Sequence, residues 1–205
     1  MLNEDEQSSD ALVAFTDASH GIGNKSSGAA ILMPEDQTQL HSVHVMSYGK
    51  SKRGIVHSEL RASVDALHIA PPGSLRALYS DCSSSVERLQ KYKINIDAAA
   101  YDKMLSVEDV VRLRDGLARH PDIEFSHLSR KDSRMKIADK FSRMARGQPE
   151  DTYALRISDT KNLQEQLRDL SLWCDEVLAQ IKAKKKSKQE AFTVDWINFP
   201  DLVEA

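Results

Sequence analysis

The sequence predicts an α/β domain, because runs typical of buried strands alternate with runs of helical periodicity over most of the chain. The clearest strand lies in residues 11–22, where residues that are apolar on both faces end on Asp17 and a glycine-containing turn follows. A charge at that point is held in the core of the sheet and requires a counter-charge, for which a metal ion is the strongest candidate. The hypothesis depends on other carboxylates reaching the same point.

Length and composition are typical of a globular protein with one domain and an appendage. The chain has 205 residues, of which 40% are hydrophobic and 29% are charged, with a net charge of −3. No apolar run approaches the ~20 residues that span a bilayer, and the polar first ten residues show no signal peptide. Cys82 and Cys174 lie far apart in the sequence and form no metal-ligand pair. Two reduced cysteines favour a cytoplasmic protein.

Three strands are expected before the first long helix. The turn-rich residues 21–28 follow the first strand, and residues 29–33 predict a second strand that Pro34 ends. Residues 39–46 alternate in polarity as a third strand does. Because the last two are separated by a short acidic turn, we expect a hairpin and three antiparallel strands in succession.

A helix and a short strand then bring two more carboxylates. Residues 58–69 carry leucine and valine at helical spacing, with Glu59 in the first turn, and a Pro-Pro-Gly sequence ends the pattern. Residues 75–79 predict a strand that runs directly into Asp81. Ser84 and Glu87 match a capping box for the next helix. Asp81 is therefore expected at a strand-to-helix junction.

The remaining elements of the domain follow the same alternation. Ser106 and Asp109 form a second capping-box pattern ahead of a helix, and residues 123–128 predict the last strand. Ser133 begins a helix that carries Asp139 in its second turn, and a Gly-Gln-Pro sequence ends the domain at residue 149. The expected order of elements is β-β-β-α-β-α-α-β-α.

Four short motifs carry the carboxylates in this order: FTDAS around Asp17, SEL around Glu59, YSDCS around Asp81 and IADKFSR around Asp139. On these motifs, residues 11–146 resemble the type 1 branch of the ribonuclease H family. The resemblance implies a five-stranded mixed sheet with helices on both faces and a site where the four carboxylates meet. Taken singly, each acid is typical of a helix cap or of a helix N-terminus.

The resemblance also implies a chemistry. Carboxylates and water are the ligands that Mg²⁺ and Mn²⁺ prefer. Two such ions in one site, both bridged by Asp17, would hydrolyse the RNA strand of an RNA–DNA hybrid and leave a 3′-hydroxyl and a 5′-phosphate. The chain is therefore expected to be a hydrolase, a metal-binding endonuclease with nucleic acid as its partner.

Several positions depart from the family pattern and keep two alternatives open. Ala18 stands where the family commonly has glycine, and Ile55, Val56 and His57 replace asparagines that contact nucleic acid in hybrid-cleaving members. His127 is our candidate for the histidine that helps product leave. The alternatives are a related nuclease on other structured nucleic acid and a non-catalytic module that binds nucleic acid or protein.

Two basic clusters flank the expected site and are candidates for phosphate contacts. The alternative for both is an ordinary solvated surface. The candidates before the helix of Glu59 and before Asp139 are Lys50, Lys52, Arg53, Arg130, Lys131, Arg134 and Lys136.

Outside the domain at residues 11–149, we expect three further segments. Residues 1–10 are predicted to be a flexible acidic leader, residues 150–190 a helical extension and residues 191–205 an aromatic and acidic tail. The extension has a heptad seam made of Leu163, Leu167, Leu170, Cys174, Val177 and Ile181. Residues 159–205 therefore form either a homodimer or protein-partner contact or a cover for the domain itself, with Trp196 and Phe199 as anchors.

Overall fold

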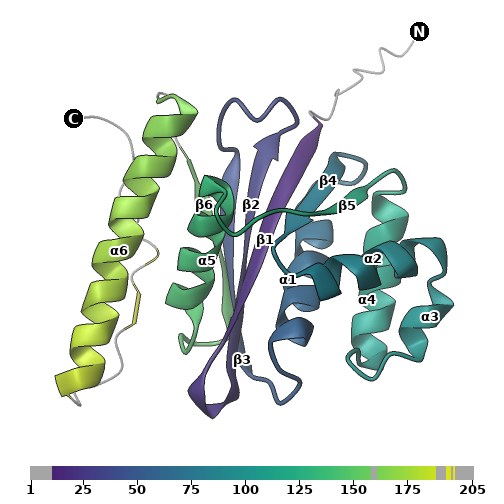
Figure 1. The fold of residues 1–205 in the computed structure, drawn as a ribbon, viewed down its shortest axis with the longest axis horizontal. Helices are drawn as coiled ribbons and strands as arrows, with labels where there is room; N and C mark the ends of the chain where they lie inside the picture. Colours follow the sequence, from purple (N-terminus) through teal and green to yellow (C-terminus); the bar gives the residue numbers. More distant parts are fainter. Residues whose placement is uncertain (1–10, 158–160, 188–192, 195, 197–205) are drawn as a thin grey trace, which may run out of the picture.

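The computed structural model describes residues 11–157, 161–187, 193, 194 and 196, so the predicted leader and Phe199 lie outside the described residues. Its strands form one mixed sheet in the order β5-β4-β1-β2-β3-β6 (Figure 1). Neighbouring strands are antiparallel from β1 through β2 and β3 to β6, whereas β1–β4 and β4–β5 are parallel. The strands are β1 (Leu12–His20), β2 (Lys25–Pro34), β3 (Ser42–Lys50), β4 (Leu75–Ser80), β5 (Glu124–His127) and β6 (Asp151–Arg156).

Helices cover both faces of this sheet, as the resemblance implied. Figure 1 shows α1 to α4 on one side and α5 and α6 on the other. The helices are η1 (Ile22–Asn24), α1 (Ile55–Ile69), α2 (Ser83–Ile94), α3 (Asp97–Ala100), α4 (Val107–Arg119), α5 (Ser133–Ala145) and α6 (Leu163–Ser187). The α/β fold class is confirmed.

β1 is the central strand, and its side chains contribute to two separate cores. Leu12 and Ala14 join the apolar cluster under α1, α2 and α4, whereas Val13 and Phe15 join the cluster under α5 and α6. This division follows from the two-residue period of a strand. A strand that must be apolar on both faces explains the continuous hydrophobic run that precedes Asp17.

The predicted number of strands is wrong, because the sheet has a sixth strand. β6 pairs antiparallel with β3, in register from Ser42 opposite Arg156 to Ser47 opposite Asp151. The predicted domain boundary at residue 149 thus lies between α5 and a strand of the same sheet. The residues of β6 had been assigned to the helical extension, whose helix in the structure begins at Leu163.

The two predicted capping boxes have different outcomes. At α4, the Ser106 side chain accepts from the Asp109 backbone and the Asp109 carboxylate accepts from the Ser106 backbone, which confirms the capping box. At α2, the N-cap is Cys82 and makes no side-chain capping bond, so the predicted box at Ser84 and Glu87 is wrong. Successive serines from residue 83 give several equivalent capping patterns, and the backbone selects an earlier start.

The heptad seam of α6 has a partner within the chain. Leu170 and Cys174 are fully buried against the α5 side of the sheet, and Leu167 and Val177 are nearly so. Lys140 of α5 reaches across to Asp175 of α6 at 2.7 Å. The seam therefore packs on the domain, and the structure gives the alternative of a homodimer no support.

The described part of the tail also packs on this side. Trp196 is 6% exposed, and its ring stacks on Tyr153 of β6 with 5.4 Å between centroids. This burial favours the alternative in which the tail covers the domain's own apolar surface. Among the described residues, no helix has both the length and the apolar character that crossing a bilayer requires.

Candidate active site

The site begins with Asp17, near the carboxyl end of β1. Asp17 is 2% exposed. It lies on the same face of the strand as Val13 and Phe15, which face α5. The Ser142 hydroxyl of α5 donates a hydrogen bond to Asp17 Oδ2 at 2.7 Å. Ser142 also donates to the Asp139 carbonyl at 2.9 Å. Asp17 is therefore held by α5 as well as by its own strand.

Two further carboxylates reach the same point from other elements. Glu59 lies on the second turn of α1 and is 2% exposed, and Asp81 follows the last residue of β4 with its side chain 3% exposed. β1 and β4 are parallel neighbours, so their carboxyl ends meet at one edge of the sheet. One oxygen from each of Asp17, Glu59 and Asp81 lies within 4.8 Å of the others. We call these three residues the carboxylate site.

The electrostatics of the carboxylate site are unfavourable without a cation. Burial, together with the charges of Asp139 and Asp81, raises the pKa of Asp17 to about 7, although Ser142 opposes the shift. Burial, followed by the charge of Asp17, raises the pKa of Glu59 well above its ordinary value. Clustered buried carboxylates repel one another and have lost their hydration, so both effects disfavour the charged forms.

Two buried oxygens indicate which kind of ligand the site fits. Glu59 Oε2 and Asp81 Oδ1 are inaccessible to solvent and have no hydrogen-bond partner among the described residues. A buried polar atom without a partner is costly, and a carboxylate oxygen more so. A purely carboxylate donor set suits the hard cations Mg²⁺ and Mn²⁺. The residues present therefore fit a divalent metal ion.

Asp139, the fourth predicted carboxylate, lies beside this group without joining it. Its charge is close enough to raise the pKa of Asp17. Its own Oδ2 accepts from Arg143, one turn further along α5, at 3.1 Å, and its side chain is 35% exposed. The structure thus brings three of the four predicted carboxylates together and leaves the fourth next to them, paired with a cation.

The last residue of β5 and the loop that follows it bring two predicted residues to Asp81. The Arg130 guanidinium Nε donates to Asp81 Oδ2, and the Arg130 side chain is 74% exposed. His127 is exposed, and its Nε2 lies 3.2 Å from the Asp81 carbonyl oxygen. These contacts place one permanent cation and one titratable ring at the open side of the carboxylate site.

Sequence reasoning missed two residues of the site. Ser142, which orients Asp17, lies three residues after Asp139, a spacing that puts both on one face of α5 and was a usable signal. Cys82 contributes to the raised pKa of Glu59, and its Sγ accepts a hydrogen bond from Ser85 at 3.2 Å. No sequence pattern distinguished this cysteine from an ordinary buried thiol.

The remaining predicted phosphate contacts divide into exposed and engaged side chains. Arg134 binds both carboxylate oxygens of Asp132 and lies 4.5 Å over the Phe15 ring, so it supports the α5 side of the fold. Four lysines are exposed, and their side chains form no hydrogen bond or ion pair with the described residues: Lys50, Lys52, Lys131 and Lys136.

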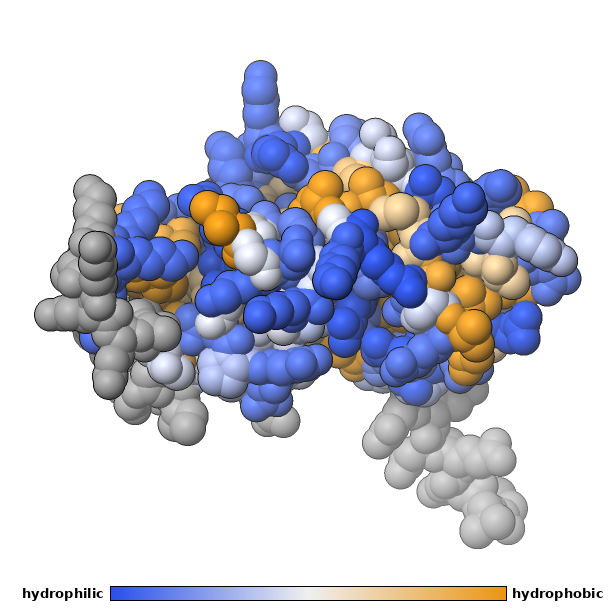
Figure 2. All heavy atoms as spheres, turned by 90° about the horizontal axis from the view of Figure 1, so that it is seen from below, coloured by the Kyte–Doolittle hydropathy of each residue, from blue (hydrophilic) through white to orange (hydrophobic). Residues whose placement is uncertain are grey.

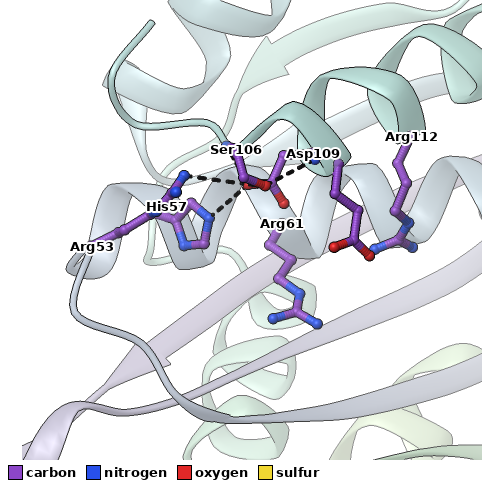
Figure 3. A pocket seen from close by; sticks show the side chains of 7 residues that line it. Arg53, His57, Arg61, Ser106, Asp109 and Arg112 are labelled. Carbon is purple, nitrogen blue, oxygen red and sulfur yellow. Dashed lines mark hydrogen bonds and ion pairs between the residues drawn. The ribbon is translucent and has the colours of Figure 1, made fainter.

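Arg53 lines a pocket of about 190 Å³ between the first turns of α1 and α4 (Figure 3). Asp109 sits at its base, where His57 contacts it at 3.2 Å and Arg53 at 3.6 Å. Burial alone would raise the pKa of Asp109, but the bonds from His57 and Ser106 outweigh burial and lower it. The full lining is Arg53, His57, Arg61, Ser106, Glu108, Asp109 and Arg112. Arg112 is paired with Asp65 at 2.5 Å, so Arg61 is the one arginine of this lining without a carboxylate partner among the described residues.

Comparison with known proteins identifies the fold. No protein-family model and no curated protein sequence matches the chain. Among solved structures, the N-terminal RNase H domain of rv2228c from Mycobacterium tuberculosis is 15% identical, with a TM-score of 0.50, and the match covers 66% of this chain and 92% of that one.

Two structures of a foamy viral protease-reverse transcriptase are also similar. The one in complex with RNA/DNA hybrid is 13% identical over 67% of this chain and 20% of that one, with a TM-score of 0.50. The one in complex with dsDNA is 12% identical over 67% of this chain and 93% of that one, with a TM-score of 0.51. At these identities the likeness establishes the fold. The chain therefore has a ribonuclease H-like fold, which confirms the resemblance at that level.

Proposed function

We propose that the chain is a metal-dependent endonuclease that hydrolyses the RNA strand of RNA–DNA hybrids. One observation carries the proposal: three buried carboxylates from β1, α1 and β4 converge within 4.8 Å, on a ribonuclease H-like sheet. Two of their oxygens, on Glu59 and Asp81, have no partner among the described residues. A fold alone does not imply an activity, so the argument rests on these side chains.

The metal is Mg²⁺ or Mn²⁺ in this proposal, with two ions in the site. Asp17, Glu59 and Asp81 would hold the ions, and Asp139 would complete the set after releasing Arg143. When bound, such ions supply an activated water and stabilise the charge that develops on the leaving oxygen. The two-ion count and the role of Asp139 come from the resemblance to the ribonuclease H family.

Other residues of the chain have positioning and binding roles. Ser142 fixes the Asp17 carboxylate through its 2.7 Å hydrogen bond. Arg130, largely exposed beside Asp81, would bind a phosphate oxygen of the scissile strand. His127, at the end of β5, would donate a proton or hydrogen bond as product leaves. Arg53 would bind a more distant phosphate through the pocket shown in Figure 3.

The substrate has one specific alternative. Ile55 and Val56 precede Glu59 where hybrid-cleaving members of the family carry asparagines, and these side chains form no base-edge hydrogen bonds. One similar structure is a complex with RNA/DNA hybrid and another a complex with dsDNA. A nuclease of this fold that cuts another duplex is therefore the second candidate, ahead of a non-catalytic binding module. The cytoplasmic location expected from two free cysteines belongs to the same proposal.

Cleavage of a labelled RNA–DNA hybrid tests the proposal. Purified protein in Mg²⁺ or Mn²⁺ should cut the RNA strand, and EDTA should stop it. Asp81→Asn removes the charge of a metal ligand while keeping its size, so the rate should fall at least ~10³-fold, equivalent to ~4 kcal/mol of barrier. Duplex RNA, duplex DNA and branched DNA complete the substrate panel.

Asp122→Asn is the matched control. Its carboxylate is 80% exposed and pairs weakly with Arg76 at 3.9 Å, at the amino end of β5. This change should leave the rate unaltered. Cleavage of another duplex in preference to hybrid would establish the second candidate. If the folded protein cuts none of the four substrates with either metal, the proposed nuclease activity is disproved.

A further inference from the structure

The two carboxylate oxygens of Asp81 have different surroundings. Oδ1 is buried and has no hydrogen-bond partner among the described residues, whereas Oδ2 accepts a charge-assisted hydrogen bond from Arg130 Nε. The Asp81 side chain is 3% exposed, so water screens this ion pair little on the Asp81 side. Within the part of the chain that the structure describes, no other ion pair reaches Asp17, Glu59 or Asp81, which makes Arg130 the one cation bound to the carboxylate site.

The charge of Arg130 acts on the carboxylate site as a whole. Its hydrogen bond to Asp81 and the charge of Asp81 raise the pKa of Arg130, and the charges of Asp17 and Asp139 add to the rise. Burial is the largest influence on Asp17 and raises its pKa, whereas the charge of Arg130 opposes that rise. A cation held by the carboxylate site would be repelled by this guanidinium, because both would bind the Asp81 carboxylate.

The contact of Ser142 with Asp17 is of a different kind. The Ser142 hydroxyl donates to Asp17 Oδ2 at 2.7 Å and carries no charge. A neutral donor orients a ligand oxygen without repelling a bound cation. Arg130 brings a full positive charge to a carboxylate of the same site, so its contact both orients Asp81 and opposes a bound cation.

Arg130 can leave Asp81 without unfolding its loop. It lies in a turn that is closed by a hydrogen bond from the Asp132 N–H to the Ser129 carbonyl at 2.9 Å, and this bond does not involve the Arg130 side chain. β1 ends at the lower end of the sheet in Figure 1, and Figure 2, which looks onto that end, shows mainly hydrophilic residues there. A guanidinium that is already 74% exposed stays hydrated on such a surface, so its release costs little beyond the ion pair itself.

We propose that Arg130 is a built-in competitor of the metal ion: its guanidinium neutralises Asp81 in the metal-free protein, must leave Asp81 before a divalent cation binds there and, once free, binds the phosphate of the substrate. The inference rests on the proposed function for the metal and for the substrate. It deepens that function, because metal binding becomes a condition for the phosphate contact of Arg130. A guanidinium has five N–H donors in one planar fork, which suits phosphate oxygens as well as carboxylates.

Metal affinity in the absence of nucleic acid tests the inference. Calorimetry or the electron paramagnetic resonance signal of free Mn²⁺ gives the Kd for Mn²⁺ in the unmodified protein and in Arg130→Gln. Glutamine keeps an N–H donor for Asp81 but removes the charge, so Mn²⁺ should bind about five- to tenfold more tightly in the variant. If Arg130 only oriented Asp81, the Kd would stay the same or rise.

Lys131→Gln is the matched control. Lys131 is the next residue of the same turn, and its exposed side chain forms no hydrogen bond or ion pair with the described residues, so the same loss of charge should change the Kd by less than about twofold. Nuclear magnetic resonance of the unmodified protein gives a second measurement. The Arg130 Nε–H should be protected from exchange with water in EDTA and should lose that protection in saturating Mg²⁺.

Three results would each overturn the inference: an unchanged or weaker Mn²⁺ affinity in Arg130→Gln, an equal gain in Lys131→Gln, or an Arg130 Nε–H that stays protected in Mg²⁺. The proposed function fails separately, because a protein that shows the expected Mn²⁺ affinities yet cleaves no nucleic acid would retain the competition and lose the nuclease. Absence of Mn²⁺ binding in both the unmodified protein and Arg130→Gln would refute the two proposals together.

Discussion

The carboxylate site and Asp102, an acid whose side chain is 13% exposed, have opposite surroundings. In the carboxylate site, Asp17, Glu59 and Asp81 face one another, and two of their oxygens have no partner among the described residues. The raised pKa values of Asp17 and Glu59 follow from burial and mutual repulsion. This group is assembled at a cost to the stability of the folded chain.

Asp102, between α3 and α4, is the opposite case. Its carboxylate accepts from the Tyr92 hydroxyl, the Arg88 guanidinium and the Met104 backbone, the last at 2.8 Å. Burial alone would raise its pKa, but these bonds outweigh burial and lower it. A satisfied buried acid stabilises the fold, whereas an unsatisfied group of acids indicates a ligand. The comparison predicts opposite responses to the same Asp→Asn change.

The largest expected effect is on the activity of Asp17→Asn. The rate of hybrid cleavage should fall at least ~10³-fold, because the charge that binds metal is lost. The free energy of unfolding without metal should not fall, since asparagine keeps the bond from Ser142 and removes a repulsive charge. Cleavage assays and denaturant melts of the same preparation check both statements. A clear loss of stability would show that Asp17 is structural and would break the comparison.

Asp102→Asn should have the next largest effect, on stability. The ion pair with Arg88 is lost and the amide cannot accept all the bonds of the carboxylate, so unfolding should become easier by about 3 kcal/mol. Denaturant melts measure this change. Cleavage well below the melting temperature should remain as in the unmodified protein. Unchanged stability would mean that the hydrogen bonds to Asp102 do not stabilise the fold, and that Asp102 does not differ from the carboxylate site in this respect.

Metal binding should remove the electrostatic repulsion within the carboxylate site and leave Asp102 unaffected. With Mg²⁺ at about 100 times its Kd, the folded state should gain about 2.7 kcal/mol, and the melting temperature should rise by roughly 5–10 °C. The increase should disappear in Asp17→Asn and persist in Asp102→Asn. Thermal melts with and without EDTA give the measurement, and an equal increase in both variants would point to metal binding elsewhere.

The smallest effect concerns pH. The pKa of Asp102 is lower in the folded chain than in the unfolded chain, so its contribution to stability is present above the unfolded value near 3.8 and is lost as pH falls through the folded value. The stability difference between Asp102→Asn and the unmodified protein should thus be constant from pH 6 to 8 and shrink below pH 4. A constant difference down to pH 3 would contradict the lowered pKa.

Much of the carboxylate site was predictable because its residues lie in local patterns. Asp17 ends a run that is apolar on both faces, and Glu59 and Asp81 lie at recognisable element boundaries. The ion pair of Asp139 with Arg143 on α5 was not predictable. The helical spacing shows that the two residues are neighbours, but it does not show which partner each side chain binds. Asp102 was missed entirely, since its partners come from helix α2 and from the turn at Met104.

β6 escaped prediction for a different reason. Its six residues include only Tyr153 and Leu155 as large apolar side chains, which is a weak alternating pattern. The strand forms because β3, about one hundred residues earlier, offers an unpaired edge. The local sequence of β6 does not indicate a partner strand so far away in the chain. Trp196 was expected to be an anchor residue, but the sequence left open whether it contacts a partner or the domain, because its contact with Tyr153 depends on β6 being in place.

The pairing of β6 with β3 also determines how this protein can be shortened. Without residues 151–156, the outer edge of β3 would lose its pairing partner from Ser42 to Ser47, a stretch that includes Val43 and Val45. An exposed strand of that length is a template for pairing with a second copy of itself, and hence for aggregation. Shortened forms that end at residue 149 should precipitate or associate through β3, whereas forms that retain β6 and α6 should remain dispersed.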